Sequence, residues 1–277
     1  MNPDNVASKD AFTKQVAISR SMLYYQHRLP TKDWRLKQRI LEVLRAHPSY
    51  GHRRLAMELD VNKKRALRVM KLFGIQPYRR RGKKWRKTKV VATFYPNLLL
   101  TELPAPTNRI WVSDFTPIPF HSRFLYLATI MDLFSREIVG FTVLLNHSVQ
   151  LVMNALLCAI NHHVPPRIIH SDQGSEYTGT DYLTIIKNLG IAVSMSARAS
   201  PWENGYQESF YSQFKVDLGD PNRFATIGEL VLAVYHTIYS YNHHRIHTKL
   251  KMPPAIFAQR QLERSNLTNQ KVLERVS

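Results

Sequence analysis

Apolar residues recur at helical spacing in the first third of the chain. A stripe within residues 34–46 predicts an amphipathic helix and consists of Leu36, Ile40, Val43 and Leu44. A shorter second helix is predicted over residues 52–59. A third follows over residues 63–73, because Asn62 is a favourable N-cap and Gly74 is placed to end the helix.

The second and third of these helices, joined by a tight turn, are typical of a helix-turn-helix. The third helix has an apolar inner face and a basic outer face. The basic residues that would contact DNA are Lys63, Lys64, Arg68 and Lys71. A plain three-helix bundle with a solvated charged face fits the same pattern, so both interpretations stay open at this point.

After residue 108 the sequence pattern changes to one in which side chains point alternately to the two sides of a strand. In residues 109–120 one side holds Trp111, Ser113 and Phe115, and the other holds Ile110, Val112, Asp114 and Thr116. This pattern predicts a strand with a carboxylate near its middle. Two more strands are predicted over residues 123–135 and 136–146 around a turn. We expect Asp132 at that turn to be a cap or ion-pair partner, not a metal ligand.

The remaining pattern completes a mixed α+β/α/β order. A helix from Ser148, a strand over 167–172, a helix over 180–190 and a strand over 191–197 follow in turn. This order predicts a ribonuclease-H-like mixed five-stranded sheet with flanking helices, preceded by an all-α helix-turn-helix domain. In such a sheet the first strand is central and the fourth lies beside it. Asp114 and Asp172 would therefore lie side by side.

Positive charge is concentrated at the front of the chain. Residues 1–100 contain 24 Lys and Arg against 6 Asp and Glu, whereas the other 177 contain 15 against 14. This asymmetry indicates an N-terminal part that binds nucleic acid, joined to a globular body in which positive and negative charges are nearly equal. The single cysteine, Cys158, excludes an internal disulfide and a Cys-rich zinc finger. With no long apolar run and no signal-peptide pattern, we expect a cytoplasmic protein that does not enter a membrane.

Two adjacent carboxylates repel each other unless a cation neutralises them. Asp114 and Asp172 therefore suggest a divalent metal, and hard oxygen ligands favour Mg²⁺ or Mn²⁺ over zinc. Glu208 is the expected third acid, on a helix that packs against the same edge. Lys215 lies seven residues beyond Glu208 and so on the same helical face. Glu176 is the rival third acid, but we expect it in a loop only four residues from Asp172.

Together these residues resemble a known family. Asp114, Asp172 and Glu208, with thirty-five residues between the last two, resemble the DD(35)E triad of transposases and retroviral integrases. The phrases WVSDFT, ATIMDLFSREIVGF, HSDQGSEY, QESFYSQFK and YNHHRIHTKLKMPPAIF resemble insertion-sequence transposases of the OrfB type. The helical segment over residues 45–75 also resembles the helix-turn-helix region of that family.

The resemblance implies metal-dependent DNA cleavage at transposon ends and transfer of the freed 3′-hydroxyl to target DNA. Asp114 would bridge two Mg²⁺ (or Mn²⁺) ions, with Asp172 binding one and Glu208 the other. The implied partners are double-stranded DNA, as terminal repeats and target, and further copies of the chain, at least a dimer. Related elements encode a leucine heptad segment in a preceding reading frame, so an upstream product is another expected partner.

Further DNA contacts are expected outside the helical part. A basic run after residue 77 is typical of an arm that lies along a phosphate backbone. Its cations are Arg79, Arg80, Arg81, Lys83, Lys84, Arg86 and Lys87. Arg198, Lys215 and Arg245 are expected to hold phosphates in the body of the protein.

The expected division of the chain has five parts. They are an N-terminal helical segment (1–30), a helix-turn-helix domain (31–77), a basic linker (78–107), the catalytic core (108–257) and a C-terminal tail (258–277). Two alternatives to a transposase remain. One is a non-catalytic DNA-binding regulator that occupies terminal repeats, and the other is a ribonuclease-H-like nuclease acting on RNA–DNA hybrids.

Overall fold

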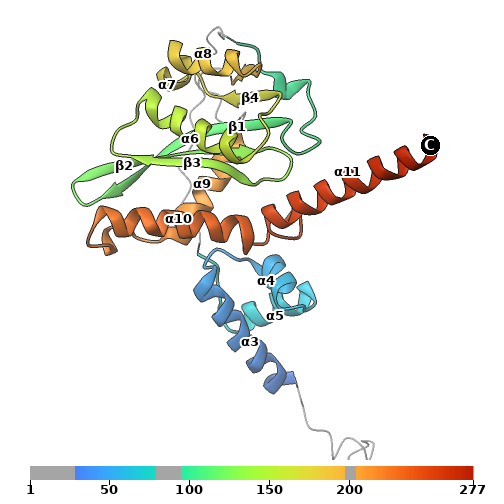
Figure 1. Cartoon of the computed structure of the whole chain (residues 1–277). Helices are drawn as coiled ribbons and strands as arrows, with labels where there is room; N and C mark the ends of the chain where they lie inside the picture. The colour runs from blue at the N-terminus through green and yellow to red at the C-terminus, as the bar shows by residue number, and fades with distance from the viewer. Residues whose placement is uncertain (1–28, 79–94, 197–203, 277) are drawn as a thin grey trace, which may run out of the picture.

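The computed structural model describes residues 29–78, 95–196 and 204–276 (Figure 1). Its first part is a helical region of α3 (Leu29–Ala46), α4 (His52–Glu58) and α5 (Lys63–Leu72). The Asn62 side chain accepts a hydrogen bond from the Lys64 N–H, and Gly74 ends α5 with a φ of 64°. A buried cluster joins the three helices and contains Leu36, Ile40, Tyr50, Leu55, Leu59, Val69 and Met70. The predicted all-α region is thus confirmed, whereas its binding to DNA stays a prediction.

The body is built on a five-stranded sheet in the order β3-β2-β1-β4-β5. The strands are β1 (Ile110–Phe120), β2 (Arg123–Asp132), β3 (Ile138–Leu144), β4 (Ile168–Ser171) and β5 (Ala192–Met195). The first three pair antiparallel, while β4 and β5 are parallel to β1. This is the predicted ribonuclease-H-like mixed sheet, with the first strand central and the fourth beside it.

Helices cover both faces of the sheet (Figure 1). One side has α6 (Val149–His162), α7 (Ser175–Thr178) and α8 (Thr180–Asn188), and the other has α9 (Gly205–Leu218) and α10 (Ile227–His243). Of two short 3-10 helices, η1 (Leu98–Leu100) contacts β4 and β5, and η3 (Pro221–Arg223) contacts β1. The last helix, α11 (Pro254–Val276), extends away from the body and crosses the expected boundary at residue 257. Glu176, expected in a loop, lies instead in the short helix α7, which follows Gly174.

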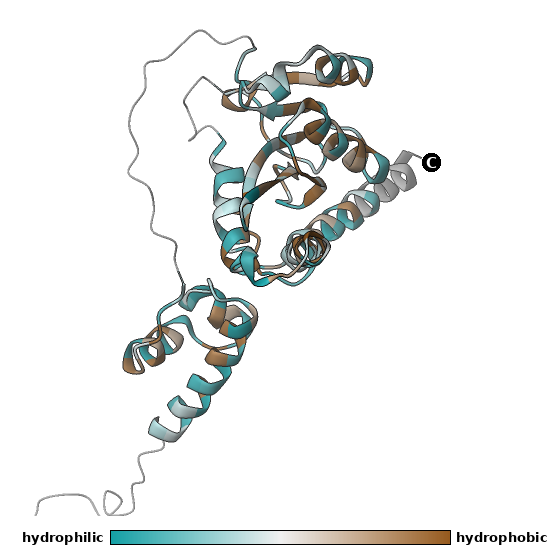
Figure 2. Ribbon diagram, turned by 90° about the vertical axis from the view of Figure 1, so that its left-hand side faces the viewer, coloured by the Kyte–Doolittle hydropathy of each residue, from teal (hydrophilic) through white to brown (hydrophobic). Residues whose placement is uncertain are grey.

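The alternation of β1 divides the interior into two cores. Ile110 and Val112 join the cluster that contains α9 and α10, whereas Trp111 joins the cluster under α6 and α8. Asp114 continues the register of Ile110 and Val112, so it belongs to the side of β1 that α9 covers. Figure 2 shows the helical region standing apart from this layered body and meeting it near one end.

The Asp132 side chain is a turn cap, as expected. It is buried, and its carboxylate accepts hydrogen bonds from the Ser135 backbone at 2.6 Å and the Asn108 backbone at 2.7 Å. These bonds hold the β2–β3 turn against the start of β1. Both carboxylate oxygens have structural partners, which fits the expectation that Asp132 is not a metal ligand.

Gly140 sets how closely α6 approaches β3. A Cβ there would lie 2.5 Å from the Ala155 carbonyl oxygen and 2.6 Å from the Ala159 Cβ. We expect Gly140→Ala to lower the free energy of unfolding by about 1–3 kcal/mol, because the helix must move away from the sheet. Urea denaturation measures this. Gly205→Ala is the control, since nothing lies within 4 Å of its added Cβ. Equal effects of the two substitutions would contradict the prediction.

Candidate active site

Asp114 lies in the middle of the central strand and is half-buried. Its Oδ1 accepts a hydrogen bond from the Phe115 N–H at 2.8 Å. Burial and the negative charges of Asp172 and Glu208 raise the pKa of Asp114 to about 7, against the opposing effects of that hydrogen bond and of Lys215. The carboxyl is therefore held in surroundings that disfavour its charged form unless a cation is supplied.

Asp172 follows directly after β4. Val112 pairs with His170 in parallel register, so Asp114 and Asp172, each two residues further along, lie side by side at the C-terminal end of β4. The Asp172 side chain accepts a hydrogen bond from the Gly174 N–H at 3.0 Å. Although much of the residue is exposed, desolvation of its carboxyl raises the pKa, opposed by the Gly174 bond and reinforced by the charge of Glu176.

Glu208 lies in the first turn of α9, and its side chain is exposed. Its negative charge contributes to the raised pKa of Asp114, so the two carboxylates are close enough to repel each other. Three acids from β1, from the end of β4 and from α9 thus lie in one neighbourhood of the fold. These three acids are far apart in the sequence, and only the fold brings them together.

Gln207 and Tyr211 attach α9 to the sheet beside Asp114. Gln207 is fully buried; its Nε2 donates to the Val112 carbonyl oxygen at 2.7 Å, and its Oε1 accepts from Thr129 at 3.0 Å. The Tyr211 hydroxyl donates to the Asp114 carbonyl oxygen at 2.6 Å and also bonds Thr129 at 2.8 Å. Glu208 follows Gln207 directly, so these bonds determine where Glu208 lies.

Lys215 lies on the same side of the sheet as Asp114. Its Nζ donates to the Thr116 hydroxyl, two residues along β1 from Asp114. Its positive charge lowers the pKa of Asp114 and so partly offsets the neighbouring carboxylates. The helical spacing of Glu208 and Lys215 therefore brings a carboxylate and an ammonium to the same site.

Glu176, the rival third acid, has other partners. Its Oε1 lies 2.7 Å from His147 Nδ1, and its Oε2 accepts from the Ser175 hydroxyl at 2.9 Å. Burial raises the pKa of Glu176, but the hydrogen bonds from His147 and Ser175, together with the charge of His147, lower it overall. Both oxygens are engaged, which leaves Glu208 as the better candidate.

His170, next to the acids in sequence, is a packed residue. It is fully buried, and its Nδ1 lies 2.8 Å from the Ser194 hydroxyl. Burial lowers its pKa to about 4, so the ring is neutral near pH 7. Its role is to join β4 to β5.

The chemistry of this donor set suits a hard divalent cation. In the parts of the chain that the structure describes, no three His, Cys, Asp or Glu side chains are close enough together to hold a metal ion between them. The available ligands are carboxylate oxygens, which Mg²⁺ and Mn²⁺ prefer. The pKa of Asp114 is raised first by burial and then by the negative charges of Asp172 and Glu208, both of which a bound cation would offset. Charge and ligand type fit such a cation, whereas a closed coordination shell requires the acids to come closer together.

Arg245 corrects one expectation. It was expected to hold a DNA phosphate, but it is buried, and its guanidinium pairs with Asp217 on α9. It also donates to the Ser49 hydroxyl at 2.7 Å and to Gln213 Oε1 at 2.9 Å. Arg245 thus joins the helical region to α9 and is not accessible to DNA. Its place among basic and histidine residues in the sequence did not indicate this burial.

The other predicted DNA contacts differ in their accessibility. Lys63, Lys64 and Lys71 are exposed on α5. Arg68 is half-exposed and pairs with the buried Asp33 at 2.6 Å, so it has a structural partner in α3. The cations of the basic run, Arg79, Arg80, Arg81, Lys83, Lys84, Arg86 and Lys87, lie outside the described residues, as does Arg198.

The role of Gln207 was not predicted from the sequence. A signal was present, because Gln207 shares a helical stripe with Phe210, Tyr211 and Phe214, all of them buried. A Gln in a buried stripe needs hydrogen-bond partners from another element. The identity of those partners, on β1 and β2, follows only from the packing of α9 on the sheet.

Comparisons with known proteins agree with this fold. Models of the integrase core domain match residues 105–201 and residues 189–254. The chain is 33% identical over 240 residues to the transposase for insertion sequence element IS904 of Lactococcus lactis subsp. lactis, covering 81% of this chain and 94% of that protein. It is 31% identical over 256 residues to InsK of insertion sequence element IS150 from Escherichia coli (strain K12), covering 87% and 90%.

A solved structure is similar in fold. A chain of the simian T-cell lymphotropic virus intasome, determined with PP2A regulatory subunit B56 gamma, has a TM-score of 0.50 and 17% sequence identity. The similarity covers 76% of this chain and 70% of that chain. At this level of identity it supports the ribonuclease-H-like architecture alone.

The pKa of Asp114 predicts how stability depends on pH without metal. A carboxyl whose pKa rises from 3.8 in the unfolded chain to about 7 in the fold destabilises the folded state as pH increases between those values. Asn at this position does not titrate. We expect the Tm of Asp114→Asn, relative to the wild type in EDTA, to increase from pH 4 to pH 7 and then level off.

Thermal unfolding across this pH range measures the difference. Asn188→Ala at the exposed end of α8 is the control, because neither asparagine nor alanine titrates. A Tm difference for Asp114→Asn that stays constant with pH would show that the carboxyl is not held in such surroundings.

Gln207→Ala tests how α9 is attached. Its loss leaves the Val112 carbonyl and the Thr129 hydroxyl without their buried partner, so we expect the free energy of unfolding to fall by about 1–3 kcal/mol. Ser209→Ala, two residues along and exposed, should change it by less than about 0.5 kcal/mol. Urea denaturation compares them, and similar values would argue against the anchoring role.

Proposed function

Because this chain belongs to the insertion-sequence transposases of the OrfB type, with an integrase catalytic core, we propose that it cuts DNA at transposon ends and joins the freed 3′-hydroxyl to target DNA. One observation carries the proposal. Asp114, Asp172 and Glu208, from three separate elements, are close enough for their charges to raise the pKa of Asp114. This is the electrostatic arrangement that phosphoryl-transfer sites relieve by binding cations.

In this proposal Asp114, Asp172 and Glu208 together bind two ions of Mg²⁺ or Mn²⁺. Bound there, such ions supply a polarised nucleophile and stabilise the leaving oxygen at the scissile phosphate. Asp114 would be a ligand of both ions, since the charges of Asp172 and Glu208 both raise its pKa. Glu208 is exposed in the first turn of α9, so its side chain is free to turn toward Asp114.

The other residues of the site bind and orient the DNA. Lys215, beside Thr116 and Asp114, attracts the phosphate that is cut. Gln207 and Tyr211 keep α9 against the sheet, so that Glu208 and Lys215 stay on one side of the DNA strand. Together these side chains place a phosphate of the DNA backbone beside the cluster of carboxylates.

The helical region binds the transposon end in this proposal. Lys63, Lys64 and Lys71 are exposed on α5 and face solvent, where a phosphate backbone is accessible to them. We retain residues 31–77 as the DNA-binding domain, 78–107 as the basic linker and 108–257 as the catalytic core. The partners proposed for the protein are duplex DNA, at least one more copy of the chain and an upstream reading-frame product. Its proposed location is the bacterial cytoplasm. No described helix is both long enough and apolar enough for a membrane span.

Charge-removing substitutions in the triad test the chemistry. Asp114→Asn, Asp172→Asn and Glu208→Gln should each lower Mg²⁺-dependent cleavage and strand transfer about a thousandfold or more, since ~4 kcal/mol of transition-state stabilisation depends on the bound ions. The assay uses DNA fragments that flank the gene and follows nicking and joining on gels. Asp181→Asn, an exposed acid on α8, is the control and should cleave like the wild type.

Full activity in any triad variant would refute the assignment. The basic helical region also fits a regulator that only occupies terminal repeats. Binding of those ends without strand breakage, in a correctly assembled complex with Mg²⁺, would favour the regulator. Cleavage of RNA–DNA hybrids in preference to duplex DNA would instead indicate a ribonuclease-H-like nuclease.

A further inference from the structure

A trough lies where the helical region meets α9. It consists of two adjoining pockets of about 470 and 580 Å³, and both are lined by Tyr78 and Val216. One pocket reaches Arg53 and Arg54 at the start of α4, and the other reaches Lys215 on α9. The trough therefore connects the basic helical region with the neighbourhood of Asp114.

The α4 end of the trough has more positive charge than its partners neutralise. Arg53 is exposed. Among the described residues, the Arg54 guanidinium has one hydrogen-bond acceptor, Gln213 Oε1 at 3.4 Å, and its Nε has none. The nearby carboxylate of Asp217 already pairs with Arg245. Burial, and after it the charge of Arg245, lower the pKa of Arg54, and the carboxylate of Asp217 opposes them only in part.

Hydroxyl and amide groups line the same pocket. Ser49, Ser212, Gln213 and Thr248 lie around Arg53 and Arg54. Arginine with neutral hydrogen-bond donors is the usual environment of a backbone phosphate. Asp220 is the acid that lines the Lys215 pocket, and it accepts a hydrogen bond from the Asn222 N–H. Asp217 pairs with Arg245.

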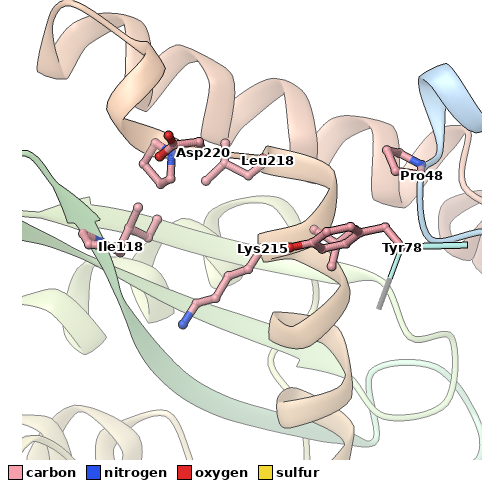
Figure 3. Close-up of a pocket in the computed structure, with 10 residues that line it drawn as sticks. Pro48, Tyr78, Ile118, Lys215, Leu218 and Asp220 are labelled. Carbon is pink, nitrogen blue, oxygen red and sulfur yellow. The ribbon is translucent and has the colours of Figure 1, made fainter. Parts of the chain in front are cut away.

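Tyr78 provides an aromatic surface between the two pockets. Its side chain is 61% exposed, and its backbone N–H donates to the Pro48 carbonyl oxygen at 3.0 Å, which holds it at the junction. Figure 3 shows the Tyr78 ring lying against α9, while Lys215 extends from α9 in the direction of the strands. An exposed ring between cations is the arrangement that binds single-stranded nucleic acid by stacking.

We propose that this trough binds a single DNA strand, with a phosphate held by Arg53 and Arg54 and a base stacked on Tyr78. The strand then continues past Lys215 toward Asp114. The proposal rests on the proposed function only in taking DNA as the occupant. It adds a binding site for an unpaired strand between the end-binding region and the catalytic core.

The test measures binding by fluorescence anisotropy in EDTA, with a duplex carrying a single-stranded extension and the same duplex with blunt ends. Tyr78→Ala should weaken binding of the extended duplex about tenfold through lost stacking, and Tyr78→Phe should stay within about twofold of the wild type. Blunt duplex should bind all three proteins similarly. Arg53→Gln should reduce the slope of log Kd against log salt by about 0.7 to 0.9, the loss of one phosphate contact.

Lys187→Gln on α8, an exposed cation far from the trough, is the matched control and should bind like the wild type. The proposal is overturned if Tyr78→Ala and Tyr78→Phe bind the extended duplex equally, or if Arg53→Gln and Lys187→Gln have the same salt slope. Cleavage with Mg²⁺, measured on the same proteins, separates the two proposals. If the proteins bind as described but the wild type never cuts DNA, the proposed function alone is refuted. If the wild type cuts DNA but the trough variants bind like it, the strand-binding role of the trough alone is refuted.

Discussion

The contact between α9 and the centre of the sheet determines the rest of the site. Gln207 and Tyr211 donate to backbone carbonyls of β1 and share Thr129 of β2, all in a buried environment. Buried polar groups are costly without partners, so these bonds permit one position of the helix. Glu208, Lys215 and Asp217 are then carried to their places by helical geometry.

That position creates an electrostatic conflict that has a functional meaning. Asp114 is held beside two other acids in a partly desolvated site, and its pKa rises to about 7 as a result. A fold selected only for stability would place an apolar or neutral residue in the middle of a central strand. The charge of Lys215 reduces this conflict and bound cations would reduce it further, which is the basis for proposing metal-dependent chemistry on a phosphate.

The same helix also connects the two parts of the chain. Asp217 and Gln213 of α9 bind Arg245, which also donates to Ser49 in the helical region. The helix that positions Glu208 is therefore also the helix that the helical region contacts. In the proposed function, a DNA end bound by the helical region would lie close to the candidate acids of the body.

The sequence by itself determined the elements and their order. Period-two alternation in residues 109–120, helical stripes before and after it, and capping residues such as Asn62 depend on local geometry, so they can be read without the fold. The three candidate acids were also identified this way, with the family resemblance. The burial of Arg245, the partners of Gln207 and the engagement of Glu176 by His147 could not be read. These depend on contacts between residues 29 to 196 positions apart, and local spacing holds no information about which distant groups will share a desolvated space.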